Sequence, residues 1–307
     1  MMTRKNFSLA AIVEWSDYQD RDQTITLVGD SLVPQQAIDW SYLAVARAKA
    51  VRGLRPQPIK PYFQDEWVTL FNADYREILP QLGTGSVDLV LTDPPYATTN
   101  LPWDKAVDWP FFWGQADRIA KLSAPMVLFS SGKFTILLIN TNLKNFRYEI
   151  IWEKNMPVGY LDAKRRPLRC HENVLVFARK FKASVYNPQM TEGPMHKRGS
   201  TTRRAPHYSV HEKNIPVTES NLYYPRSVWR FSNTRQGKSL HPTQKPLEMM
   251  ERLAKTFSNR GDLILDPFAG SGTTLQAARN CGKRAVGVEL NEEYCEVIAR
   301  RLERGDE

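Results

Sequence analysis

The sequence has little cysteine and no long apolar run. Its three cysteines, Cys170, Cys281 and Cys295, form neither a Cys-x-x-Cys pair nor a metal-ligand spacing. This spacing excludes a disulfide framework and predicts a reduced, intracellular protein. No apolar run approaches the length of a membrane span, and the N-terminus lacks a secretory signal pattern, so we expect no membrane partner. The five histidines are scattered, and we expect no metal site.

Positive charge is concentrated in one part of the chain. The whole sequence of 307 residues has a net charge of +9, and residues 181–235 carry nine Lys or Arg against three acids, or +6 of that total. Tyrosine, histidine and tryptophan side chains are interleaved with these bases. The mixture is typical of a surface that binds phosphates and bases, and a solvated basic insertion is the alternative.

The order of apolar segments predicts an α/β fold. Residues 1–60 carry no catalytic pattern, although a helix is expected from residue 39 to a stop at Gly53, followed by a proline-rich linker. From Trp67 onward, strands alternate with helices. We expect strands at 68–71, 87–92, 126–129, 148–152, 174–177, 263–265 and 285–288, and helices at 75–82, 109–122, 134–143, 246–257, 274–281 and 292–302. This alternation predicts a doubly wound, mostly parallel sheet covered by helices on both faces.

A glycine-rich turn follows one of these strands. In "LILDPFAGSGTTLQAA", Gly270 and Gly272 allow close approach of a ligand to the backbone, and the next helix begins with free N–H donors. Glu289 ends the next strand, where α/β nucleotide folds place an acid against ribose hydroxyls. The third glycine of a dinucleotide fingerprint is replaced by Leu275, which disfavours NAD.

Four motifs in order give the chain a family resemblance. "DPPY" (Asp93–Tyr96), "RPLRCHENVLVFARK" (Arg166–Lys180), "HPTQKP" (His241–Pro246) and "DPFAGSGTT" (Asp266–Thr274) resemble those of the DNA amino-methyltransferases, which use S-adenosylmethionine. The order, with the catalytic motif before the cofactor motif, is similar to the circularly permuted beta group. The resemblance covers about Trp67 to Leu302. It implies S-adenosylmethionine as cofactor, double-stranded DNA as partner, and a bacterial or phage-encoded, cytoplasmic and nucleoid-associated protein that could form a homodimer.

The resemblance gives the DPPY stretch a chemical role. An exocyclic base amine is a poor nucleophile, because its lone pair is delocalised into the ring. Asp93 and the carbonyl of Pro94 would accept its two N–H groups, and Pro94 with Pro95 would hold these acceptors in place. Tyr96 would stack on a base extruded from the duplex. The alternative is an acid that caps a turn and a tyrosine that packs at its rim.

Further residues of these motifs are candidate cofactor ligands. They are Asp74, Thr243, Lys245, Asp266, Phe268, Gly270, Ser271, Gly272, Thr273 and Glu289. Asp266 would hold the cofactor ammonium or the loop, or is only an acid at a helix N-terminus. Thr243 and Lys245 would contact the cofactor carboxylate or cap the next helix. Asp74 would lie near the adenine or cap its own helix. His171 and Glu172 receive no catalytic role.

Four regions follow from this interpretation. Residues 1–60 form an extension of unknown role, 61–180 the catalytic half, 181–235 the target-recognition region, and 236–307 the cofactor-binding half. The residues expected to contact DNA are Lys164, Arg165, Arg166, Lys197, Arg198, Arg203 and Arg204. Asp93 at the head of the motif favours adenine N6 over cytosine N4 as the methyl acceptor. Two rival hypotheses are methylation of RNA or of a protein amine, and a catalytically silent DNA-binding protein.

Overall fold

The computed structural model describes residues 59–97, 105–198, 218–233 and 244–304. The chain divides into two units, Met1–Gln57 and Pro58–Glu307, and every described residue belongs to the second. The helix expected from residue 39 to Gly53 lies outside the described residues.

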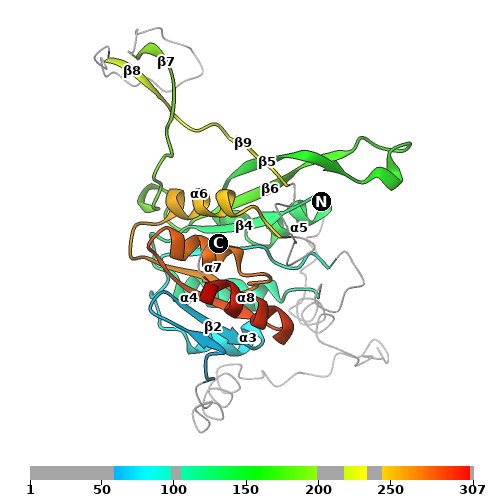
Figure 1. Cartoon of the computed structure of the whole chain (residues 1–307), viewed down its shortest axis with the longest axis vertical. Helices are drawn as coiled ribbons and strands as arrows, with labels where there is room; N and C mark the ends of the chain where they lie inside the picture. Colours follow the sequence, from blue (N-terminus) through cyan, green and yellow to red (C-terminus); the bar gives the residue numbers. More distant parts are fainter. Residues whose placement is uncertain (1–58, 98–104, 199–217, 234–243, 305–307) are drawn as a thin grey trace, which may run out of the picture. The chain divides into compact units, whose positions relative to one another are not determined.

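Helices and strands alternate along most of this unit, as the sequence predicts (Figure 1). The helices are α3 (Tyr75–Ile78), α4 (Trp109–Ile119), α5 (Lys133–Thr141), α6 (Leu247–Phe257), α7 (Thr273–Asn280) and α8 (Glu292–Arg304). The strands are β1 (Phe63–Gln64), β2 (Val68–Asn72), β3 (Leu89–Thr92), β4 (Met126–Ser130), β5 (Phe146–Val158), β6 (Arg169–Phe177), β7 (Thr191–Arg198), β8 (Thr218–Tyr223), β9 (Val228–Phe231), β10 (Leu263–Asp266) and β11 (Arg284–Glu289).

The central sheet is mostly parallel. Within the described ranges it contains nine strands in the order β1-β2-β11-β10-β3-β4-β6-β5-β9. The run from β2 through β11, β10 and β3 to β4 is parallel throughout. β6 is antiparallel to both of its neighbours, β4 and β5, and β1 is antiparallel to β2. The predicted α/β class with a mostly parallel sheet is therefore confirmed.

Both faces of the sheet are buried, which explains the continuous apolar strands. In β3, Leu89 and Leu91 belong to one hydrophobic cluster, whereas Val90 belongs to the other. The first cluster includes apolar side chains of α6, α7 and α8, and the second includes those of α4 and α5. Each fully buried leucine contributes about 1.5–3 kcal/mol through the hydrophobic effect. The two layers of helices hold the ends of the parallel strands in fixed positions.

The helices begin and end where local chemistry requires. Asp74 caps α3 by accepting a hydrogen bond from the Arg76 backbone N–H, and Asp108 caps α4 through the N–H of Phe111. The helix expected at 75–82 is shorter, because Pro80 lies in a following 3₁₀ turn and cannot donate a backbone hydrogen bond. Within the described ranges, no helix has the length and apolar character needed to cross a bilayer.

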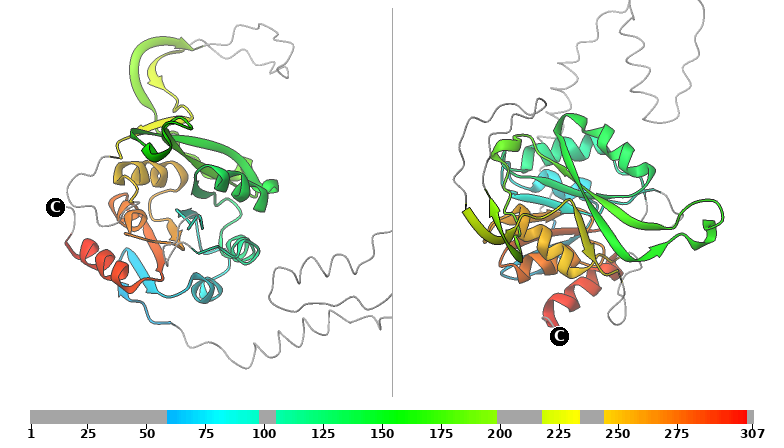
Figure 2. Two further views of the ribbon diagram at one scale, coloured as in Figure 1. Left: turned by 90° about the vertical axis from the view of Figure 1, so that its right-hand side faces the viewer. Right: turned by 90° about the horizontal axis from the view of Figure 1, so that it is seen from above.

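The strands β5 and β6 extend further than the sequence predicts. They pair as a long antiparallel hairpin that extends beyond the rest of the sheet (Figures 1 and 2). Its outer part, from Asn155 to Val158 on β5 and from Arg169 to His171 on β6, is largely exposed and has no apolar run. A pattern search based on burial therefore detects only the inner half of each strand.

The basic segment 181–235 contains strands that its composition does not indicate. β7 and β8 form a separate two-stranded antiparallel sheet, and β9 joins the edge of the central sheet beside β5. In β9, Trp229 is buried and donates a hydrogen bond from Nε1 to the carbonyl of Arg226. Part of the expected recognition region, Val228–Phe231, thus belongs to the central sheet.

Candidate active site

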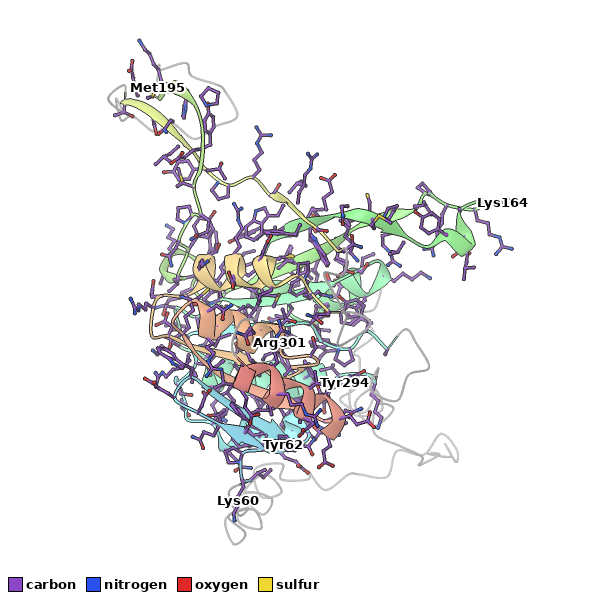
Figure 3. The ribbon with its side chains drawn as sticks, viewed as in Figure 1. Lys60, Tyr62, Lys164, Met195, Tyr294 and Arg301 are labelled. Atoms are coloured by element: carbon purple, nitrogen blue, oxygen red, sulfur yellow. The ribbon has the colours of Figure 1, made fainter. Side chains whose placement is uncertain are left out.

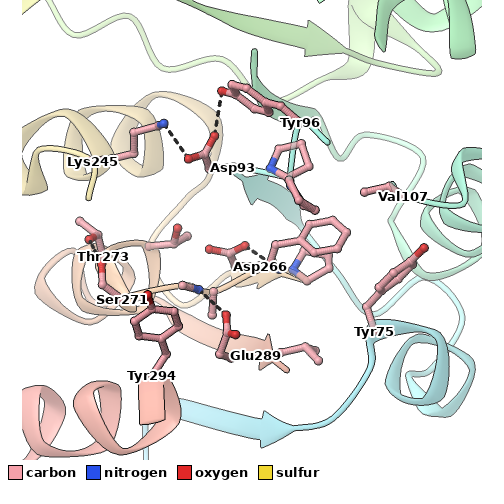
Figure 4. A pocket seen from close by; sticks show the side chains of 18 of the residues that line it. Tyr75, Asp93, Tyr96, Val107, Lys245, Asp266, Ser271, Thr273, Glu289 and Tyr294 are labelled. Atoms are coloured by element: carbon pink, nitrogen blue, oxygen red, sulfur yellow. Dashed lines mark hydrogen bonds and ion pairs between the residues drawn. The ribbon is translucent and has the colours of Figure 1, made fainter. Parts of the chain in front are cut away.

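Four neighbouring parallel strands carry a carboxylate at their carboxyl ends. Asp74 follows β2, Glu289 ends β11, Asp266 ends β10, and Asp93 follows β3. Ligands of open α/β sheets bind at this edge. All four acids line one cavity of about 780 Å³, and Figure 4 shows Asp93, Asp266 and Glu289 around the same space. The sheet thus brings together the two motifs that the sequence separates.

The glycine-rich turn between β10 and α7 is held by Glu289. Gly270 and Gly272 have φ angles of +54° and +75°, which favour glycine. The backbone N–H of Gly270 donates to Oε2 of Glu289 at 2.8 Å, and Gly270 lines the cavity. Gly272 does not belong to the cavity wall. A Cβ atom there would come within 2.8 Å of the Ile298 side chain, so this glycine permits close packing of α7 against α8.

Glu289 is buried, yet its carboxylate keeps room for a ligand. Its second oxygen, Oε1, accepts a hydrogen bond from the Asn291 N–H at 2.8 Å. Burial raises the pKa of Glu289 above its ordinary value. A carboxylate can accept about four hydrogen bonds, and the backbone N–H groups of Gly270, Leu290 and Asn291 use only part of that capacity. The arrangement fits a ligand with hydroxyl groups.

Asp266 is tied to the end of the neighbouring strand β3 and to the glycine-rich turn. Its Oδ1 accepts hydrogen bonds from the Thr92 hydroxyl at 2.6 Å and from the Phe268 N–H at 3.1 Å. Burial raises the pKa of Asp266 to about 6. The carboxylate therefore orders the start of the glycine-rich turn, one of the roles expected for it, and it also lines the cavity.

The DPPY stretch presents its acid and its ring to the same cavity. Asp93 follows four buried residues of β3, and the hydroxyl of Tyr96 donates to Oδ1 of Asp93 at 3.0 Å. One face of the Tyr96 ring stacks on Phe134, with ring centroids 4.5 Å apart and planes 20° from parallel. Burial raises the pKa of Asp93, and the ammonium of Lys245 partly opposes that shift. Asp93, Pro94, Pro95 and Tyr96 all line the cavity.

Lys245 lies against Asp93. Its Nζ is 2.6 Å from Oδ2 of Asp93 and 3.1 Å from Oε2 of Glu172. Burial alone would lower the pKa of Lys245, but the two carboxylates raise it, so the ammonium stays charged. The expected helix cap is wrong for Lys245, because the N-cap residue of α6 is Pro246 and the Lys245 ammonium is a donor that lies against two carboxylates. Lys245 was also expected to contact a cofactor carboxylate. In this structure its ammonium already pairs with the carboxylates of Asp93 and Glu172.

Glu172 and Lys154 extend this cluster and were given no role from the sequence. Lys154 forms an ion pair with Oε1 of Glu172, and its ammonium lies 4.7 Å from the centroid of the Trp152 ring. Strand periodicity could have located both residues. Glu172 shares a face of β6 with the buried Val174 and Val176, and Lys154 shares a face of β5 with Trp152. A charged residue that shares a strand face with buried apolar residues is expected to point into the protein.

The remaining candidate ligands lie on the cavity wall or beyond the described residues. Asp74, Phe268, Ser271 and Thr273 line the cavity, and Asp74 also caps α3. Phe268 packs against Tyr75 with ring centroids 5.0 Å apart. Tyr75, Lys105 and Tyr294 are further wall residues that carried no motif signal. Thr243 lies outside the described residues.

The residues expected to contact DNA lie in two places. Lys164, Arg165 and Arg166 lie in the turn that joins β5 and β6, and Figure 3 shows Lys164 at the end of this hairpin. The Arg165 side chain is 86% exposed, and Arg166 pairs with Asp162 at 2.7 Å. On the small sheet, Lys197 of β7 pairs with Glu219 of β8 at 3.4 Å, and Arg198 ends β7. Arg203 and Arg204 lie outside the described residues.

Comparisons with known proteins agree with this geometry. The family model N6_N4_Mtase, described as DNA methylase, matches residues 87–300. DNA adenine methyltransferase YhdJ of Escherichia coli (strain K12) is 30% identical over 257 residues, which cover 78% of this chain and 84% of that protein. The crystal structure of the M1.HpyAVI–SAM complex has a TM-score of 0.53 at 25% identity and covers 76% of this chain and 98% of its own. The cytosine-N4-specific PvuII DNA methyltransferase has a TM-score of 0.59 over 80% of this chain and 89% of its own, but its 17% identity shows the fold alone.

Proposed function

Because the chain belongs to the N6_N4_Mtase family of DNA methylases, we propose that it transfers a methyl group from S-adenosylmethionine to N6 of adenine in double-stranded DNA. The observation that carries this proposal is one cavity lined by the DPPY acid and by the glycine-rich turn. Adenine is supported by the acid Asp93 at the head of the motif and by the name of the relative YhdJ. Cytosine N4 is the alternative acceptor, since the family includes both chemistries.

The cavity residues fit S-adenosylmethionine, which supplies an electrophilic methyl group when it is bound. Glu289 would accept hydrogen bonds from ribose hydroxyls, because its carboxylate is fixed and retains spare acceptor capacity. The Gly270 backbone passes the cavity without a side chain in the way. Phe268 would offer an aromatic surface, and Asp266 would hold the turn.

The other end of the cavity would bind the base amine. Asp93 and the carbonyl of Pro94 would accept its two N–H groups and leave the nitrogen lone pair directed at the methyl group. One face of the Tyr96 ring is covered by Phe134, so the base would stack on the opposite face. The amine loses a proton after it is methylated, which restores a neutral product.

The enzyme would have to extrude the base, because the reacting amine is inaccessible inside the duplex. Lys164 and Arg165 at the end of the β5–β6 hairpin would contact phosphates, and they are exposed enough to do so. Such contacts position a protein on DNA without reading its sequence. We assign the reading of bases to the region 181–235, where aromatic and basic residues are mixed.

We also assign the chain to the permuted beta group. In the sheet, β10 with the glycine-rich turn lies directly beside β3 with Asp93. In the chain, β3 comes first and residues 181–235 separate the two strands. This order of catalytic motif, variable region and cofactor motif supports the assignment.

Nucleoside mass analysis tests the proposed function. Duplex DNA is incubated with the purified full chain and isotopically labelled S-adenosylmethionine, and its nucleosides are then separated and weighed. We expect the label in N6-methyladenine. Label in N4-methylcytosine would show that cytosine N4, and not adenine N6, is the methyl acceptor. DNA that is bound by the protein but carries no label would support a catalytically silent DNA-binding protein.

A further inference from the structure

Four charged side chains form a chain of alternating sign at the wall of the cavity. Lys154 of β5 contacts Glu172 of β6, Glu172 contacts Lys245, and Lys245 contacts Asp93. The side chains of Lys245, Lys154 and Glu172 are only 9%, 10% and 15% exposed. Two ammonium groups balance two carboxylates, which makes the burial of all four charges tolerable.

Lys245 takes a position that the proposed reaction needs. Its ammonium lies 2.6 Å from Oδ2 of Asp93, and the Tyr96 hydroxyl already donates to Oδ1 of the same carboxylate. An incoming base amine must donate to this carboxylate as well. At such a short distance the ammonium competes for the oxygen and neutralises much of its charge. Each oxygen of Asp93 still has a lone pair for the amine, but a weaker contact with Lys245 would restore the negative charge that makes this carboxylate a strong acceptor.

The displaced ammonium needs another acceptor, because a buried charge without a partner costs several kcal/mol. Oε2 of Glu172 fits this need. It lies 3.1 Å from Nζ of Lys245, and it is a buried atom that accepts no well-formed hydrogen bond from the described part of the chain. The other oxygen of Glu172 is held by Lys154. Glu172 is thus fixed in place with one acceptor directed at Lys245.

We propose that Glu172 is a positioning residue for methyl transfer, which takes the Lys245 ammonium from Asp93 when the target amine arrives. This inference rests on the proposed function. It adds the transfer of the Lys245 ammonium from Asp93 to Glu172, which lets Asp93 bind the amine. Lys154 holds Glu172 in place and keeps the cluster neutral. Burial would raise the pKa of Glu172, but Lys245 and Lys154 lower it, so the acceptor is ionised.

Single-turnover methyl transfer to duplex DNA at saturating cofactor tests this exchange. Glu172→Gln keeps the size of the side chain and removes its charge, so Lys245 should stay on Asp93. We expect a transfer rate about ten- to a hundredfold lower, the range for losing a hydrogen bond to a charged group, with an unchanged Kd for S-adenosylmethionine. The control is Glu149→Gln, which removes the charge of an exposed residue on the neighbouring strand β5 and should transfer at the wild-type rate.

A charge-matched double variant separates positioning from a structural role. If Glu172 acts only through Lys245, Lys245→Met/Glu172→Gln should transfer faster than Glu172→Gln and as fast as Lys245→Met. The second comparison remains valid even if Glu172→Gln alone fails to fold. The exchange would be overturned by a double variant slower than Lys245→Met, or by a folded Glu172→Gln with the wild-type rate. In either case, methyl transfer by the wild-type protein would still uphold the proposed function. Failure of the wild-type protein to methylate DNA would overturn both.

Discussion

The Nζ atom of Lys245 lies 2.6 Å from Oδ2 of Asp93, although the two residues come from opposite halves of the chain. One follows a buried strand, and the other immediately precedes the Pro246–Leu247 start of α6. The sequence assigned them to different roles, to base orientation and to a cofactor carboxylate. Their contact joins the two motifs in one electrostatic unit, in which each charge shifts the other's pKa towards the ionised form and opposes the effect of burial.

Substitutions of Tyr96 should separate its ring from its hydroxyl group. Tyr96→Ala removes the stacking surface, which is worth about 1–3 kcal/mol per base, so single-turnover transfer should fall about five- to 150-fold. Tyr96→Phe keeps the ring and loses only the hydrogen bond to Asp93, so its loss should be smaller. Equal losses in the two variants would mean that the hydroxyl is the functional part.

Glu289→Ala should weaken binding of S-adenosylmethionine by about ten- to a hundredfold, because a hydrogen bond to a charged group contributes about 1.5–3 kcal/mol. Calorimetric titration of the cofactor into the folded variant measures the effect. Glu293→Ala is the matched control, since Glu293 is an exposed residue near the start of α8. An unchanged Kd for Glu289→Ala would show that the ribose is held elsewhere.

Asp266→Asn should stabilise the cofactor-free protein above pH 6. Burial raises the pKa of Asp266 from 3.8 to about 6, so the folded state binds this proton more tightly than the unfolded state. The contribution of Asp266 to the free energy of unfolding therefore falls as the pH rises from about 4 to 6, by about 1.4 kcal/mol per pKa unit. Denaturant unfolding should show the advantage of Asp266→Asn growing through this window and constant above it. A stability advantage of Asp266→Asn that does not change with pH would contradict the raised pKa of Asp266.

Neutralising the hairpin end should weaken DNA binding regardless of sequence. For Lys164→Ala/Arg165→Ala, the slope of log K against log salt should fall by about 0.9 for each lost phosphate contact. Binding to target and non-target duplexes is measured across a salt series. Arg260→Ala/Arg284→Ala is the control. It removes the same charge from exposed positions near the N-terminal ends of β10 and β11, whereas the cavity lies at their carboxyl ends. Equal slopes for wild type and the hairpin variant would make these residues a solvated surface.

Burial explains which parts of the fold the sequence could predict. Strands such as β3 and β4 are buried on both faces, so they are continuous apolar runs and their positions were expected closely. The outer halves of β5 and β6 are exposed, and β7 and β8 are polar strands that pair only with each other, so neither pair has a core-facing pattern. The antiparallel insertion of β6 depends on tertiary pairing that no local pattern records.

The site could be predicted only where its residues belong to motifs. Asp93 and Glu289 follow or end apolar strands, and strand order alone brings their carboxylates to one edge. Glu172 and Lys154 interact through neighbouring strands whose register was unknown, so neither their ion pair nor the contact of Glu172 with Lys245 could be anticipated. The function of Gly272 likewise depends on Ile298 of a later helix.

Methyl transfer by Asp93→Ala, compared with its cofactor affinity, tests the central claim most directly. Asp93 would orient the base amine but not hold the cofactor, which Glu289 and the glycine-rich turn would bind at the other end of the cavity. In single-turnover reactions with labelled S-adenosylmethionine and duplex DNA, we expect no measurable N6-methyladenine from the variant, and a Kd for the cofactor close to that of the wild type. Transfer at a rate near that of the wild-type protein would contradict the account.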